Sequence, residues 1–119
     1  MLSLPSSTRV FLARDRVDGR KGLDSLVALI RAQFGRDPLH GHLFVFLSRR
    51  ADRARVLFWD RNGYVLTLKR LEHGTFKPSR FDATHTEIGH DELLALLGGL
   101  DMSAARRRPA WSPRLISPR

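Results

Sequence analysis

The sequence predicts an α+β fold: an antiparallel sheet of four to five strands, with one amphipathic helix on one face and a short C-terminal helix. Two patterns indicate this class. Apolar residues recur with a helical period over 21–34, and three runs rich in β-forming residues follow between 42 and 71. The chain has 119 residues, 42% of them hydrophobic, which suffices for one core. We assign residues 1–101 to a single domain and residues 102–119 to a flexible basic tail.

The N-terminal third is predicted to contain a strand and the longer helix. Residues 9–14 (RVFLAR) form the strand, and the helix spans Lys21 to Phe34. Gly35 is a plausible helix stop, and Asp18 is a candidate N-cap that would place Arg20 and Lys21 in the first turn. The spacing i, i+3, i+4, i+7, i+11 directs five apolar side chains toward the sheet, namely Leu23, Leu26, Val27, Ile30 and Phe34.

The middle of the chain predicts a three-stranded antiparallel meander. Residues 42–48 (HLFVFLS) form a continuous apolar run, typical of a buried central strand. Residues 55–59 and 64–71 flank an Asn-Gly step, which is a strong hairpin signal. We expect Trp59, at the end of its strand, to belong to the core.

The last expected elements are a further strand at 84–88 and a short helix from His90 to Leu97. Gly98 and Gly99 end this helix, and Leu93, Leu94 and Leu97 form its inner face. The residues beyond Asp101 contain three prolines and no periodicity, which is why we predict a flexible tail there.

Positive charge is concentrated in two parts of the chain. The formal net charge is +9, and residues 104–119 contain five arginines and no acid. Residues 49–80 contain nine basic residues against three acids. Such a distribution is typical of proteins that contact phosphates. Arginine is also simply abundant here, since 18 of the 21 basic residues are Arg, as a GC-rich coding sequence would give.

Residue types and spacing argue against an enzyme. The chain has no cysteine, and its five histidines lack the spacing of known metal motifs. Its acids are scattered, and neither a Walker motif nor a G-x-S-x-G motif is present. We therefore predict no catalytic residues, no metal and no cofactor. No signal peptide or membrane-length apolar run is evident, so we expect a cytoplasmic protein without a membrane partner.

Several charged and aromatic positions resemble one protein family. They are Gly41 to Phe46, Arg49-Arg50, Asp52-Arg53, Trp59-Asp60, Gly63, Lys69 to Glu72, Gly74 and Phe76, with Arg20 to Asp24 before the first helix. Together they resemble the small TnpB/Orf2-like accessory protein of the insertion-sequence family numbered sixty-six. This family is not the RNA-guided nuclease that shares the name TnpB. The resemblance implies a role in transposition beside a separate DDE-type transposase.

Basic residues around the predicted hairpin are the candidate nucleic-acid contacts. Guanidinium groups there would neutralise phosphates without reading base sequence. A solvated sheet edge kept soluble by charge is the simpler alternative. Two functions follow: an accessory factor that binds element ends or transposition intermediates as DNA, or an assembly factor that binds the transposase or another element-encoded protein. The candidate residues are Arg20, Lys21, Arg49, Arg50, Arg53, Arg55, Lys69 and Arg70.

Overall fold

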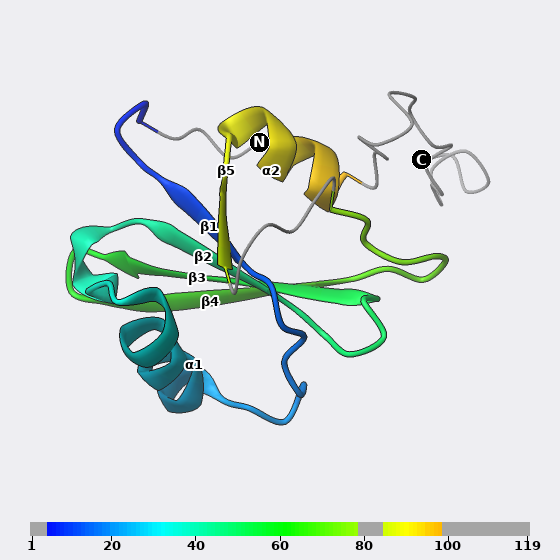
Figure 1. Cartoon of the computed structure of the whole chain (residues 1–119), viewed down its shortest axis with the longest axis horizontal. Helices are drawn as coiled ribbons and strands as arrows, with labels where there is room; N and C mark the ends of the chain where they lie inside the picture. The colour runs from blue at the N-terminus through cyan, green and yellow to red at the C-terminus, as the bar shows by residue number, and fades with distance from the viewer. Residues whose placement is uncertain (1–4, 79–84, 99–119) are drawn as a thin grey trace, which may run out of the picture.

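A five-stranded sheet in the order β4-β3-β2-β1-β5 forms the centre of the protein (Figure 1). The computed structural model describes residues 5–78 and 85–98. The elements are β1 (Val10–Ala13), α1 (Leu23–Leu29), the π-helical turn η1 (Ile30–Phe34), the 3-10 turn η2 (Pro38–His40), β2 (Leu43–Leu47), β3 (Arg53–Asp60), β4 (Gly63–Arg70), β5 (His85–Ile88) and α2 (His90–Leu97).

The predicted α+β class is confirmed, including the three-stranded meander of β2, β3 and β4. Three of the strand pairs are antiparallel, and β1 and β2 pair in parallel with Val10 opposite Leu43. A parallel pair requires a crossover connection, and α1 and η1 supply it. The strand order brings β5 beside β1, although these two strands are far apart in the sequence.

The longer helix covers one face of the sheet, as predicted. It runs without a break through α1 and η1, and Gly35 ends it with a left-handed φ of 64°. Its buried side chains pack on Phe11, Phe44 and Phe46 of β1 and β2. The ring of Phe34 meets that of Phe44 edge-on at 5.4 Å between centroids. The residues buried from the helix are Leu26, Val27, Ile30 and Phe34, with Leu23 partly buried.

One detail of this helix differs from the prediction. The N-cap is Gly22, so Arg20 and Lys21 precede the helix and do not lie in its first turn. The Asp18 carboxylate accepts a hydrogen bond from the Arg20 backbone N–H at 2.9 Å instead. Asp18 therefore stabilises the turn before the helix and does not cap the helix itself.

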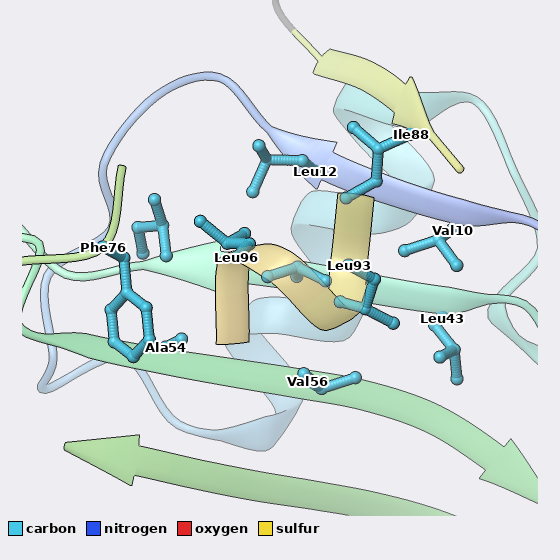
Figure 2. Close-up of a cluster of buried hydrophobic side chains, with 11 residues drawn as sticks. Val10, Leu12, Leu43, Ala54, Val56, Phe76, Ile88, Leu93 and Leu96 are labelled. Carbon is cyan, nitrogen blue, oxygen red and sulfur yellow. The ribbon is translucent and has the colours of Figure 1, made fainter. Parts of the chain in front are cut away.

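The other face of the sheet is covered by α2 (Figure 2). Leu93 and Leu96 lie over Val10, Leu12 and other strand residues. The prediction of the inner face was wrong at Leu94, which is 41% exposed, whereas Leu96 is buried. Leu97 packs partly buried against the cluster. The central strands β1 and β2 are therefore buried on both faces, which explains their continuous apolar runs.

The hairpin between β3 and β4 turns at Arg61 and Asn62. Asp60 pairs with Gly63, so two residues connect the strands, and Arg61 adopts a φ of 53°. Trp59 is half-buried, with its ring edge-on to Tyr64 at 5.0 Å between centroids, and it is not fully enclosed in the core.

The predicted basic tail, residues 102–119, lies outside the described residues. Within residues 5–78 and 85–98, none of the helices has the length and apolar character that crossing a membrane would require.

Candidate nucleic-acid interface

The loop from Ser48 to Arg53 is held in shape by backbone and short side-chain contacts. Ala51 adopts a φ of 59°, its N–H donates to the Ser48 carbonyl at 2.8 Å, and its own carbonyl accepts from the Phe76 N–H at 2.7 Å. The Ser48 hydroxyl donates to Asp52 Oδ1 and accepts from the Arg53 N–H, both at 3.1 Å. The loop conformation therefore does not depend on the side chains of the two arginines at its tip.

Arg55 connects this loop region to the segment before α1. Its guanidinium donates to the backbone carbonyl of Lys21 and, at 3.2 Å, to that of Asp18. Partial burial lowers the pKa of Arg55, and the nearby Asp18 charge opposes this effect. These bonds bring Arg20 and Lys21, which are distant in sequence, beside the arginines of the β2–β3 loop.

The two loops and the start of β3 enclose a surface depression of about 410 Å³, which we call the basic cleft. It includes four of the predicted site arginines. Leu68 closes it from β4, and this side chain is 60% exposed. The lining residues are Asp18, Gly19, Ser48, Arg49, Arg50, Asp52, Arg53, Arg55 and Leu68.

Two acids neutralise part of this charge. The Arg20 guanidinium and backbone N–H hydrogen-bond Asp18 and hold the pKa of its carboxyl well below the usual range, and the Arg49 charge adds to this effect. Asp52 Oδ1 lies 3.5 Å from Arg53 Nη1. The two acids are outnumbered by the cations around them, so the cleft keeps a positive excess.

Arg49 and Arg50 contribute most of the available charge. Both side chains are exposed at the tip of the loop. Across residues 5–78 and 85–98, neither arginine donates a side-chain hydrogen bond or forms an ion pair within 4.0 Å. Their guanidinium groups are consequently available to an anionic ligand.

The structure separates Lys69 and Arg70 from each other. Arg70 lies across from Arg53 on the face covered by α1, and its guanidinium contacts Glu72 at 3.1 Å. Lys69 alternates to the face covered by α2, where its Nζ donates to the Leu97 carbonyl at the end of that helix. The cleft thus gathers Arg49, Arg50, Arg53 and Arg55, with Arg20 and Lys21 beside it, and leaves Lys69 on the opposite face.

Sequence reasoning did not select Ser48, Gly19 or Leu68 as part of this site. Ser48 directly follows the buried apolar strand β2, and a serine in a loop commonly hydrogen-bonds nearby backbone groups, so its position could have indicated this role. Leu68 follows the strand alternation of the exposed β4, so nothing in the sequence marked it as a cleft residue.

A second group of charges lies at the other end of β1. Arg9 Nε donates to Glu87 at 2.9 Å and so lowers the pKa of that carboxyl. His42 Nδ1 accepts from the Arg9 backbone N–H at 3.0 Å. Burial lowers the pKa of His42, and the charges of Arg36 and Arg9 lower it further. These contacts join β1, β2 and β5, so this group of charges stabilises the sheet.

Metal-ligating side chains do not gather in the part of the chain that the structure describes. No group of three or more His, Asp or Glu residues there is arranged to hold an ion.

Comparison with known proteins identifies the family. The family model described as IS66 Orf2 like protein matches residues 8–107. The chain belongs to this family. As an IS66 Orf2-like protein, it has an accessory role in an insertion sequence, in agreement with the resemblance found in its motifs.

Two curated relatives match nearly the whole chain. The uncharacterized protein y4jC of Sinorhizobium fredii (strain NBRC 101917 / NGR234) is 34% identical over 119 residues, covering 98% of this chain and 100% of the relative. The uncharacterized protein y4hO of the same organism is 33% identical over 116 residues, covering 98% and 99%. No solved structure matches this IS66 Orf2-like protein.

Proposed function

We propose that this IS66 Orf2-like protein serves transposition by binding the phosphate backbone of DNA through the basic cleft. The observation that supports the proposal is the pair Arg49 and Arg50, exposed on a hydrogen-bonded loop that lines a positively charged depression. Because the loop backbone is already held by hydrogen bonds, binding does not require that backbone to become ordered.

The geometry favours phosphate over base recognition. Arginine guanidinium groups fork onto phosphate oxygens, and two adjacent arginines on one loop can contact successive phosphates. The cleft is lined by residues of two loops and of strands β3 and β4, and none of its lining residues belongs to a helix. We therefore expect binding that is strongly salt-dependent and similar for element and unrelated sequences.

The test is a binding titration with a double variant, Arg49→Ala with Arg50→Ala. Purified protein is titrated against labelled element-end DNA, unrelated DNA and purified transposase over a range of salt concentrations. We expect weaker binding to both DNAs, with the slope of log affinity against log salt reduced by about two, one for each lost phosphate contact. Arg31→Ala is the matched control, because this arginine is exposed on the helix away from the cleft.

The same titration contains the outcome that would replace the proposal. If the double variant loses transposase binding while DNA binding is absent or unchanged, the cleft is a protein interface. The charge would then complement an acidic face of the transposase, and the protein would act as an assembly factor. If no affinity changes, and a transposition assay with the double variant gives the wild-type frequency, the arginines are only a solvated surface.

A further inference from the structure

The strand β4 forms one edge of the sheet and is unusually long and regular for an edge. It spans eight residues, pairs with β3 along its whole length and contains no proline or bulge. Its central side chains Leu66 and Leu68 are 36% and 60% exposed. Edge strands of soluble proteins are normally short, interrupted or covered, because their free backbone groups accept another strand.

Among residues 5–78 and 85–98, no strand pairs with the outer side of β4. The direction of its outer backbone groups follows from the register with β3. The Leu71 N–H donates to the Asp52 carbonyl at 2.8 Å, so this residue points toward β3. The backbone N–H and C=O groups of successive residues point alternately toward and away from the neighbouring strand. Gly63, which pairs with Asp60 at the turn, is an even number of residues from Leu71 and therefore also points toward β3. The N–H and C=O groups of Tyr64, Leu66, Leu68 and Arg70 therefore point outward from the sheet.

We infer that β4 pairs with β4 of a second copy of this chain, antiparallel about a two-fold axis through Thr67. This register places Tyr64 opposite the second copy's Arg70 and Leu66 opposite its Leu68. Each of these is a hydrogen-bonded pair, so every outward N–H and C=O from Tyr64 to Arg70 obtains a partner. The two sheets become one continuous sheet across the axis, with an isologous interface of the kind that closes dimers.

The side chains of β4 are self-complementary in this register. On the α1 face, the exposed leucines of both copies meet as two cross-strand pairs, and Arg70 reaches the ring of the second copy's Tyr64. On the α2 face, Thr67 meets its own copy, a favourable cross-strand pair. Lys69 lies opposite Val65 of the second copy, so no two cations face each other.

Lysine and arginine commonly protect an edge from pairing, and β4 carries one of each. Here both side chains have other contacts within their own chain. Lys69 binds the end of α2, and Arg70 is paired with Glu72. Their positions at one end of the strand also place the basic ends of two antiparallel copies at opposite ends of the interface. Repulsion over that separation is largely screened at physiological salt.

Pairing would also join the two basic clefts. Leu68 lines the cleft, and in this register it lies beside the two-fold axis. The diagonal separation between Leu68 of the two copies is about 7–8 Å. The inference does not rest on DNA binding, however, since it depends only on the edge of the sheet.

Cross-linking tests the register directly, because the natural chain contains no cysteine. Thr67→Cys should form a disulfide-linked dimer under mild oxidation, since a non-hydrogen-bonded pair on the axis has Cα atoms about 4.5 Å apart, within disulfide range. Val65→Cys is the matched control on the same strand and face. Its two copies would lie about 14 Å apart, so it should not cross-link to itself.

Sedimentation of the full chain over a concentration series gives an independent readout. We expect a dimer for the wild type and a monomer with an unchanged circular dichroism spectrum for Leu66→Asp, which places a carboxylate in the leucine pairs. A wild-type monomer at all concentrations would overturn the inference. A dimer that persists in Leu66→Asp, or equal cross-linking of Thr67→Cys and Val65→Cys, would overturn it as well.

Discussion

Replacing Arg55 with alanine distinguishes an arginine that holds the fold together from the arginines proposed to bind DNA. The sequence placed Arg55 among the DNA contacts, but its guanidinium donates to the carbonyls of Lys21 and Asp18 and ties the segment before α1 to β3. Hydrogen bonds from charged donors contribute about 1.5–3 kcal/mol each at most. Because the Arg55 side chain is only partly buried, water replaces part of this in the variant. We therefore expect Arg55→Ala to lower the free energy of unfolding by about 1–2 kcal/mol.

Urea denaturation followed by tryptophan fluorescence measures this change. The denaturation midpoint should fall while the slope of free energy against urea stays unchanged, since the surface exposed on unfolding hardly differs. The melting temperature should fall by about 4–8 °C. Arg31→Ala serves as the control and should stay within about 0.5 kcal/mol of the wild type. The reasoning is refuted if Arg55→Ala is as stable as the wild type and has instead lost affinity for DNA, because Arg55 would then contact the ligand and not the fold.

Three further predictions concern the core, the response to pH and the tail. Ile30→Asp should unfold the domain, because it places a carboxylate at a fully buried position between the helix and the sheet. Ala28→Asp, on the exposed side of the same helix, should not. Circular dichroism melts compare the two variants, and an unchanged melting temperature for Ile30→Asp would disprove this packing. The lowered pKa of His42 means that the fold favours its neutral form, so the stability it contributes is present above the ordinary histidine pKa of about 6.5 and is lost as the pH falls through that value toward the folded pKa. His42→Asn keeps an acceptor for the Arg9 N–H but does not titrate, so the pH dependence of unfolding below about 6.5 should be shallower in this variant; an identical profile would assign that dependence to other groups. Removing residues 104–119 should leave the fold intact and, if DNA is the partner, flatten the salt dependence of binding. A truncated protein that fails to fold would show that these residues are structural.

Periodic elements were predictable because their signals are local. The helix over residues 21–34 follows from the spacing of Leu26, Ile30 and their neighbours, and the meander follows from apolar runs around an Asn-Gly step. The short helix α2 has too few turns for its apolar spacing to define one buried face. The sequence therefore predicted Leu94 as buried, whereas the buried residue is Leu96. The parallel pairing of β1 with β2 joins residues more than thirty positions apart, which no local pattern specifies.

The sequence could predict which residues belong to the candidate site, but not how the fold arranges them. Adjacent charged residues marked Arg49 and Arg50 as exposed loop positions. The distinction between these two and Arg55 depends on which carbonyl groups the fold places within reach of each guanidinium. Lys69 and Arg70 were predicted together as contacts of one site, although adjacent residues of a strand lie on opposite faces. Which of the two faces adjoins the cleft depends on the position of the two helices.

The left-handed turn at Ala51 has a consequence for how this surface can change. The loop is fixed by the Ser48 hydroxyl, the Asp52 carboxylate and the Phe76 backbone, none of which requires a particular residue at the two tip positions. Substitutions at 49 and 50 therefore carry little folding penalty, so these two positions can change without a loss of stability. The same property makes these positions suitable for randomised libraries or for attaching a fluorescent probe.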